Sequence, residues 1–306
     1  MSAIAVAVVS YNTREHLRAC LARVFADSPI QVIVVDNGSS DGSGEMVAAE
    51  FPAAELHVDW SNRGYGAAAN QAIARARAPY ILLLNSDTIV QPGALDALSN
   101  YLDQHPAVGV LAPRLLNPNG TLQRSCFPFP TPLLPFLGQR PLVRMLTRVP
   151  LLRDRHVTAW SHDQPRRVPW ALGAALAVRR KAFDDVGGFD ESFRMYFEET
   201  DLCYRLKMAG WETHFSPVTD VVHVGGASTS QYRAAMVAEL FVSSLLFYEQ
   251  HSSRLGLAVA TVVTRLSVRG RLWRDTAAWR LARSGSKRMV RAENIAVWRR
   301  LLEQLR

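Results

Sequence analysis

The feature that most constrains the fold is an apolar run that ends in polar residues, within the stretch from Pro79 to Val90. Tyr80 to Asn85 is almost wholly apolar, which is typical of a strand buried on both faces of a parallel sheet. The run stops at Asn85-Ser86-Asp87-Thr88. Open α/β sheets bind ligands at the carboxyl ends of their strands, so Asp87 is well placed to hold a divalent cation beside a phosphate. Asp87 could equally cap the following turn or helix.

Similar apolar runs precede this one, and segments with helical patterns separate them. This β-α-β-α-β-α-β order predicts a parallel, doubly wound half. The predicted strands cover residues 3–10, 31–35, 56–59 and 80–85. Small residues from Ser61 to Asn70 would let the backbone approach a ligand at the start of a helix. No GxGxxG motif follows the first strand, which weighs against an ordinary dinucleotide-binding fold.

The second half of the chain alternates less regularly. Prolines punctuate residues 113–169, and a long irregular insertion of this kind is usually functional or disordered. Its apolar residues 127–137 either line an acceptor groove or touch a membrane, or they fold onto the body of the protein. Regular structure resumes with predicted strands at 170–178, 211–216 and 220–224, and with helices at 180–186 and up to about 209.

An acidic group, Glu198-Glu199-Thr200-Asp201, begins the last of these helices. Carboxylates are favoured at a helix start by the helix dipole, so an ordinary helix start would explain them. The spacing also permits an i,i+4 ion pair between Asp201 and Arg205.

Positive charge is concentrated at the C-terminal end. Residues 265–306 hold twelve Arg and Lys against three acids, a net charge of +9, whereas the whole chain carries +8. Tryptophans lie among these arginines, as in helices at a membrane interface. In the helical region after residue 231, the longest apolar stretch, 255–263, is far short of the roughly 20 residues of a spanning helix. We therefore expect a basic helical extension that meets an anionic membrane, packs on the body or a second subunit as in a homodimer, or is simply solvated.

Cysteines and the first residues indicate the compartment. Cys20, Cys126 and Cys203 form no CxxC pair, which argues against a zinc ribbon or a disulfide framework. Residues 1–12 have no basic leader and suit a first strand better than a signal peptide. We therefore expect a cytoplasmic protein. The basic extension and the apolar residues 127–137 fit a peripheral position at the inner face of the cell membrane.

Seven segments, taken together, resemble the inverting glycosyltransferases of family 2, and among them the bacterial rhamnosyltransferase-like branch. The segments fall in order and cover roughly residues 4–250, whereas the chain after about residue 255 matches less well. They are VVSYN (8–12), VVDNGSSDGS (34–43), NRGYGAAANQAI (62–73), LLLNSDT (82–88), GAALAVRRKAFDDVGGFDE (173–191), MYFEETDLCYRLKMAGW (195–211) and HVGGAS (223–228).

This resemblance implies a GT-A fold, an α/β fold with a Rossmann-like, mostly parallel central sheet flanked by helices, here with a C-terminal helical extension. We expect a GT-A domain over 1–235, in which 1–112 binds the nucleotide sugar and 113–235 holds the acceptor and catalytic residues. The basic extension would cover 236–306. The implied donor is dTDP-L-rhamnose or a UDP-sugar, and the implied acceptor is a cell-surface glycan or a polyprenyl-diphosphate-linked saccharide.

The same resemblance assigns roles to individual residues. The residues implied in donor binding are Ser10, Asn12, Asp36, Asn62, Gly66 and Asn85. Asn85-Ser86-Asp87 stands where the family has its Asp-x-Asp motif, so Asp87 would bind a Mg or Mn ion. Asn85 replaces the first acid, which leaves more of the coordination to the diphosphate. His223 would complete the metal site, although a histidine at a strand end could simply bond to the backbone.

Glu199 matches the second acid of the Glu-Asp-x-Asp segment and would be the general base, with Asp201 as the second choice. The implied reaction is a metal-assisted displacement in which an acceptor hydroxyl attacks the anomeric carbon and inverts it. Two other classes stay open: a non-catalytic nucleotide-sugar-binding protein of the same fold, and a basic-tailed nucleic-acid binder. We expect no nucleic acid partner, because the body shows no recognition module.

Overall fold

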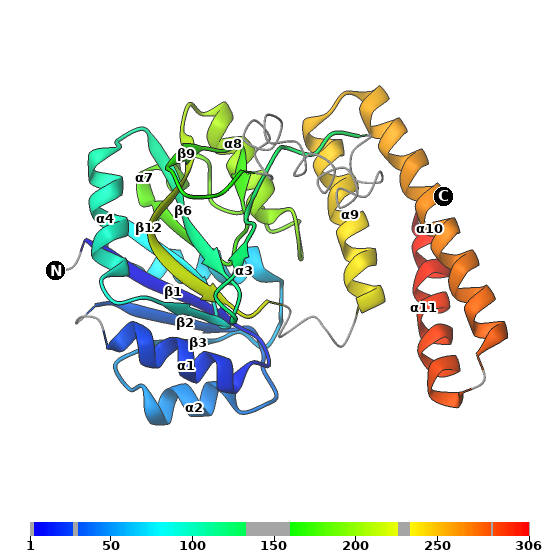
Figure 1. Cartoon of the computed structure of the whole chain (residues 1–306), viewed down its shortest axis with the longest axis horizontal. Helices are drawn as coiled ribbons and strands as arrows, with labels where there is room; N and C mark the ends of the chain where they lie inside the picture. Colours follow the sequence, from blue (N-terminus) through cyan, green and yellow to red (C-terminus); the bar gives the residue numbers. More distant parts are fainter. Residues whose placement is uncertain (1–2, 27–29, 133–159, 226–232, 283, 306) are drawn as a thin grey trace. The chain divides into compact units, whose positions relative to one another are not determined.

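The computed structural model of the 306-residue chain describes all residues except 1–2, 27–29, 133–159, 226–232, 283 and 306. The chain forms two compact units (Figure 1). The α/β unit comprises residues 1–129, 146–194 and 198–228. The helical unit comprises residues 130–145, 195–197 and 229–306.

A mixed sheet with the strand order β3-β2-β1-β4-β11-β6-β12-β5 forms the centre of the α/β unit. Its strands are β1 (Ile4–Ser10), β2 (Val32–Asp36), β3 (Glu55–Val58), β4 (Tyr80–Asn85), β5 (Thr88–Val90), β6 (Val108–Leu116), β11 (Ala175–Arg179) and β12 (Glu212–His223). The four strands β3, β2, β1 and β4 are parallel, as predicted. Short strands add to this sheet or pair separately: β7 (Leu122–Gln123) pairs with β6, β9 (Arg166–Arg167) pairs with β12, and β8 (Cys126–Phe127) pairs with β10 (Trp170–Ala171) in a sheet of their own.

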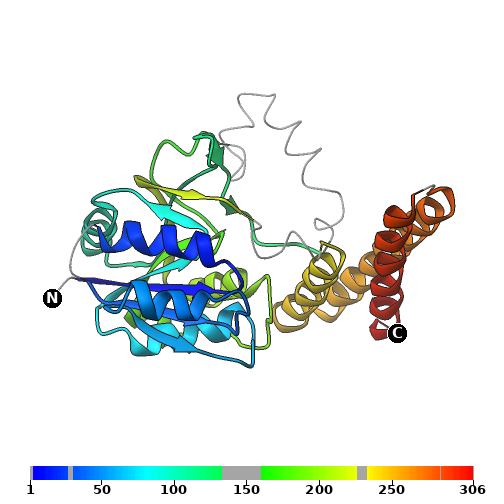
Figure 2. The same cartoon turned by 90° about the horizontal axis from the view of Figure 1, so that it is seen from below.

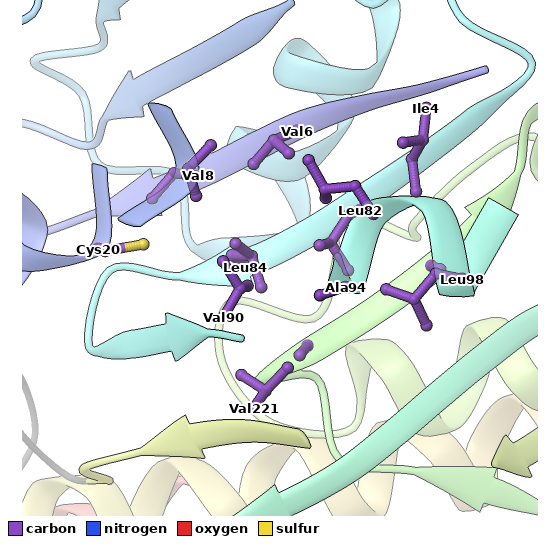
Figure 3. Close-up of a cluster of buried hydrophobic side chains, with 14 of the residues drawn as sticks. Ile4, Val6, Val8, Cys20, Leu82, Leu84, Val90, Ala94, Leu98 and Val221 are labelled. Carbon is purple, nitrogen blue, oxygen red and sulfur yellow. The ribbon is translucent and has the colours of Figure 1, made fainter. Parts of the chain in front are cut away.

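Helices cover both faces of this sheet. They are α1 (Arg14–Phe25), α2 (Ser43–Glu50), α3 (Tyr65–Arg75), α4 (Ala94–Gln104), α7 (Arg180–Asp185) and α8 (Glu198–Met208). Side chains of a strand point alternately to the two faces, and the central strands are buried on both. One apolar cluster joins Val6 and Leu82 to residues of α1, α2 and α4, and Figure 3 shows its centre. The other joins Ala7 and Leu83 to residues of α3, α7 and α8.

Two details of the second half differ from the predicted elements. Residues 211–216 and 220–224 were expected as separate strands, but β12 is one strand whose register against β6 shifts between Ser216 and Asp220. Pro217 lies in this irregularity, where a proline can be accommodated because a ladder hydrogen bond is missing. The predicted strand 170–178 is divided between β10 and β11, and β11 runs antiparallel to both of its neighbours.

The helical unit contains α9 (Arg233–His251), α10 (Arg254–Leu281) and α11 (Gly285–Gln304). Helices α10 and α11 lie side by side and antiparallel in both views (Figure 1, Figure 2). A buried carboxylate, Asp275 of α10, joins them by an ion pair with Arg291 and by accepting a 2.8 Å hydrogen bond from Trp298 Nε1. Among the described helices, none is both long and apolar enough to cross a membrane.

Candidate active site

The parallel register of the first strands gathers the predicted donor-binding residues at one edge of the sheet. Ser10, the last residue of β1, is paired with Asp36, the last residue of β2. On the other side, Val9 is paired with Asn85, the last residue of β4. The polar residues that follow these three strands therefore share the carboxyl edge, where open α/β sheets bind ligands.

The loops after β1 and β2 hold each other through Asn12. Its backbone N–H donates to Ser39 Oγ at 2.8 Å, and its Oδ1 accepts from the Ser40 N–H at 2.7 Å. Asn12 has a φ of 51°, in the left-handed region that asparagine tolerates best among non-glycine residues. Ser39 also donates to Asp36. Burial raises the pKa of Asp36, and the hydrogen bond from Ser39 opposes that rise.

A buried chain of hydroxyl groups connects the first strand to the loop that carries Asp87. Ser10 Oγ lies 3.2 Å from Thr13 Oγ1, which lies 2.6 Å from Ser86 Oγ. These hydrogen bonds fix the loop after β1 to the loop after β4, although the residues are more than 70 positions apart. Side-chain hydrogen bonds thus hold together the segments that were predicted to bind the donor and the metal.

The segment before α3 also requires small residues. Asn62 has a φ of 43° and accepts a hydrogen bond from Asn37 Nδ2 at 3.1 Å. At Gly64, whose φ is +102°, an added Cβ would lie 2.1 Å from the carbonyl oxygen of Arg194. At Gly66 it would lie 3.2 Å from Phe189 Cβ and close to Glu198. The predicted donor residues Asn62 and Gly66 therefore also pack this loop against the segment that leads to α8.

Asp87 and His223 form a close pair. His223 Nε2 lies 3.3 Å from Asp87 Oδ1, and the N–H of Gly225 donates to Asp87 Oδ2 at 3.1 Å. Burial by itself would raise the pKa of Asp87, but the interactions with His223 and with backbone N–H groups, that of Gly225 among them, together lower it. Asp87 thus stays ionised, as a metal ligand must be.

Gln123, at the end of β7, orients the histidine. Its side-chain nitrogen donates to Asn117 Oδ1 at 3.1 Å and to the carbonyl of His223 at 3.3 Å, which leaves Oε1 to face His223 Nδ1 at 2.6 Å. A carbonyl oxygen can only accept, so Nδ1 carries the hydrogen. A neutral ring with its hydrogen on Nδ1 has its lone pair on Nε2, 3.3 Å from Asp87 Oδ1, and this is the tautomer that would bind a metal.

This pair fits a divalent ion that also binds a diphosphate. Two neighbouring ligands of an octahedral ion bound at about 2.1 Å are about 3 Å apart, close to the 3.3 Å between Asp87 Oδ1 and His223 Nε2. Two protein ligands leave the other positions to phosphate oxygens and water. Among the described residues, no cluster of three His, Cys, Asp or Glu residues suited to a metal was found.

Glu198 and Glu199 form a buried acidic pair at the start of α8. Each has an Oε2 atom that is buried and has no hydrogen-bond partner. Burial raises the pKa of both, and the charge of Glu199 raises that of Glu198 further. Backbone N–H groups of Gly173 and Thr200 stabilise the ionised form of Glu199. Glu198 therefore holds its proton more tightly than Glu199, and Glu199 is the first of the pair to ionise.

The segment before β11 connects this pair to the metal-binding loop. The carbonyl of Ala174 accepts from the backbone N–H of Asn85 at 3.0 Å, and an added Cβ on Gly173 would lie 3.7 Å from Glu199 Cβ. Tyr65 donates to the carbonyl of Gly173 at 3.3 Å. Glu199 therefore lies against the residues that border the end of β4, on the same edge as Asp87 and His223.

Asp201, the second choice for a base, is engaged elsewhere. It is fully buried and pairs with Arg205 at 2.6 Å, the i,i+4 partner that the sequence allows. Arg205 in turn donates to the carbonyl of Val186 at 2.7 Å. This arrangement fixes α8 on the loop after α7, which is a structural task.

The sequence did not single out Gln123, Thr13 or Tyr65. Gln123 lies in the proline-punctuated region, where no periodicity marks a strand, and polar residues such as Thr13 have many structural uses. Two aromatic residues of the apolar segment 127–137 pack within the α/β unit: Phe127 on Trp170 and Phe129 on Tyr204, with ring centroids 4.9 and 5.3 Å apart. Residues 130–132 belong to the helical unit, where Tyr248 donates to the carbonyl of Thr131 at 2.9 Å. The other residues of that segment, from 133 onward, lie outside the described residues.

A surface hollow of about 590 Å³ lies at the opposite end of β4, beside Tyr80 and Trp211. Its basic residues are already used: Arg179 and Arg180 donate to backbone carbonyls, and Lys181 pairs with Asp185. The basic side chains that line the hollow therefore already have partners within the protein, and the hollow is separate from the carboxyl edge.

Comparisons with known proteins identify the family of the chain. The family model described as glycosyltransferase-like family 2 matches residues 2–242. N-acetylglucosaminyl-diphospho-decaprenol L-rhamnosyltransferase of Mycobacterium tuberculosis is 32% identical over 269 residues, 81% of this chain and 84% of that protein. Rhamnosyltransferase WbbL of Escherichia coli is 25% identical over 224 residues, 71% of this chain and 81% of that protein.

Two solved structures share the fold. Mannosyltransferase PcManGT from Pyrobaculum calidifontis, in complex with GDP-Man and Mn²⁺, gives a TM-score of 0.55 at 17% identity and covers 99% of this chain and 84% of its own. GalNAc-T7 with UDP, GalNAc and Mn²⁺ gives 0.53 at 15% identity and covers 80% and 49%. The predicted GT-A fold is confirmed. The chain is a glycosyltransferase and belongs to glycosyltransferase family 2.

Proposed function

We propose that the chain is an inverting glycosyltransferase that transfers L-rhamnose from dTDP-L-rhamnose to a hydroxyl of a polyprenyl-diphosphate-linked saccharide. The observation that carries this proposal is the pairing of Asp87 with His223 on the same sheet edge as Glu199, whose buried Oε2 has no hydrogen-bond partner. The named rhamnosyltransferase relatives support the choice of sugar, and the name of the mycobacterial relative supports a lipid diphosphate acceptor.

In this proposal the first half of the domain, residues 1–112, holds the nucleotide. The residues that a base and ribose would contact lie at the ends of two strands and in the loops that follow. Ser10 and Asp36 end β1 and β2, whereas Asn12 follows β1 and Asn62 follows β3. Asp87 and His223 would hold Mg²⁺ or Mn²⁺, which, when bound, offsets the charge that develops on the nucleoside diphosphate. Residues 113–235 would bind the acceptor.

Glu199 would take the proton of the attacking hydroxyl. Burial raises its pKa, which makes the carboxylate a stronger base than an exposed glutamate. Its Oε2 has no partner within the protein and so can accept that proton. Glu198, with its raised pKa, would limit the negative charge of the pair. The hydrogen bond from Tyr65 to the carbonyl of Gly173 would hold the segment before β11 in place beside Glu199. Attack from the face opposite the leaving group inverts the anomeric centre.

The test is a transfer assay with the full chain, Mn²⁺ and a short-chain polyprenyl-diphosphate N-acetylglucosamine. The donors would be dTDP-L-rhamnose, UDP-glucose, UDP-N-acetylglucosamine and GDP-mannose, with product detected by mass spectrometry and its anomeric configuration by NMR. We expect transfer from dTDP-L-rhamnose with inversion. Donor binding without transfer to any acceptor would contradict the enzymatic proposal, and transfer from another donor alone would contradict the choice of sugar.

A further inference from the structure

We propose that the exposed face of α10 lies in the interfacial region of a bilayer that contains anionic lipid. Four aligned apolar side chains and two arginines on the same side of this helix carry the inference. The proposal goes beyond glycosyl transfer and does not depend on which sugar or acceptor the enzyme uses. It names one surface of the helical unit and the chemistry of what covers it.

The apolar side chains form a line along one side of α10. Leu255, Val262, Leu266 and Trp273 are 75%, 53%, 60% and 75% exposed. With about 3.6 residues per turn, separations of 7, 11 and 18 residues are close to whole turns, so the four stand above one another. The buried residues Ala260, Thr264, Val268 and Asp275 follow the opposite side of the helix. Exposed apolar residues scattered singly are ordinary, but an aligned set that includes tryptophan marks an interaction surface.

Two exposed arginines lie on the same side of α10 as these apolar side chains. Arg269 and Arg280 are exposed, and they lie 14 and 25 residues from Leu255, again close to whole turns at about 3.6 residues each. The sequence of α10 contains one acidic residue, Asp275, and it is fully buried against Arg291 and Trp298. The outward face therefore combines apolar side chains with cations, while the anion of the helix points inward.

An anionic bilayer suits both parts of this surface. Leucine and tryptophan side chains reach the boundary between headgroups and acyl chains, and arginines pair with lipid phosphates above it. A second copy suits it less well, because a two-fold interface brings up the same face of the partner, on which α10 exposes no acid to pair with these arginines. Nucleic acid would attract the arginines but has no use for a line of leucine and valine along the helix.

The experiment is flotation of the full chain with phosphatidylcholine vesicles that contain either no anionic lipid or phosphatidylglycerol. We expect partitioning onto the anionic vesicles. The double variant Arg269→Gln/Arg280→Gln should partition about 30-fold less well, because each arginine near an anionic surface contributes about fivefold. Trp273→Ala should also weaken partitioning on vesicles of either charge.

Matched controls separate the face from overall charge. Arg299→Gln/Arg300→Gln removes the same charge from exposed positions of α11, and Trp60→Ala removes an equally exposed indole from the α/β unit. Both should partition nearly as the unmodified chain does. Equal losses for the two arginine pairs, or no partitioning at all, would overturn the proposal. So would a dimer in light scattering that Leu266→Gln dissociates.

Transfer to a water-soluble acceptor, measured without vesicles, keeps this test distinct from that of the enzymatic proposal. Trp273→Ala should keep this activity, because α10 is not among the elements that carry site residues. Loss of vesicle binding with unchanged transfer supports the membrane face. Absence of transfer by every form of the chain would count against the proposed function and leave the flotation result valid by itself.

Discussion

Replacing Gln123 by leucine tests whether the neutral tautomer of His223 prepares the metal site. Leucine has a similar size but cannot accept the Nδ1 hydrogen at 2.6 Å or donate to the carbonyl of His223 and to Asn117. The imidazole would then be free to rotate or to carry its hydrogen on Nε2. In that tautomer no lone pair faces Asp87, and the ring cannot bind an ion there.

The expected size of the effect follows from the hydrogen bonds that leucine cannot make. Glutamine makes three of them here, and the one to Nδ1 orients a ligand whose side chain is only 9% exposed. Removing such an outer partner typically lowers metal affinity by about 10- to 100-fold. We therefore expect the dissociation constant for Mn²⁺, measured with bound dTDP, to rise by about that factor.

Electron paramagnetic resonance of free Mn²⁺ measures this affinity without any turnover. Two controls make the result specific. Gln31→Leu removes an amide that bonds Glu55 and Arg75 before the start of β2, away from the carboxyl edge, and should leave Mn²⁺ affinity unchanged. Gln123→Glu keeps an acceptor for Nδ1 and should retain most of the affinity. Unchanged Mn²⁺ binding by Gln123→Leu would refute the argument from the tautomer.

Three further predictions concern the folded state. Gly64→Ala should lower the free energy of unfolding in urea by about 2–5 kcal/mol, because the new Cβ meets a backbone carbonyl at a φ of +102°. The control Gly120→Ala has a φ of +77° but open space around the new Cβ, so its free energy of unfolding should fall by less. Equal losses for the two variants would contradict the contact argument. Asp275→Asn should destabilise the helical unit by about 3 kcal/mol in hydrogen exchange, since it leaves a cation unpaired, and unaltered protection would contradict this. Glu198→Gln should stabilise the protein at neutral pH. Burial raises the pKa of Glu198 in the folded state, so the stability of the unmodified protein falls as pH rises from the unfolded-state pKa through the folded-state pKa. Thermal unfolding across this pH range should show that the variant has lost this slope.

The first half of the fold could be predicted because its strands are buried on both faces. The runs that became β1, β2 and β4 are almost wholly apolar, and the parallel order follows from the alternation with helices. Asp87 and His223 were expected to meet, and they do, because β12 ends beside β5, which directly follows Asp87. The i,i+4 spacing likewise anticipated the pair of Asp201 with Arg205.

The remaining features depend on long-range contacts that leave no local pattern. Gln123 reaches His223 across 100 residues from a two-residue strand, which is too short to produce any periodicity. The sequence predicted separate strands at 211–216 and 220–224, yet pairing with β6 on both sides of the irregularity keeps β12 continuous. The unpartnered oxygens of Glu198 and Glu199 become visible only when the packing around α8 is known.

The most direct test of the account is the turnover of Glu199→Gln measured together with its affinity for the donor. Glutamine keeps the size of the side chain but cannot take a proton, so transfer should fall by about 10²- to 10⁴-fold. The dissociation constant for the nucleotide sugar in the presence of Mn²⁺ should stay within a few fold of that of the unmodified enzyme. Near-normal turnover by Glu199→Gln would contradict the assignment of the base and with it the proposed mechanism.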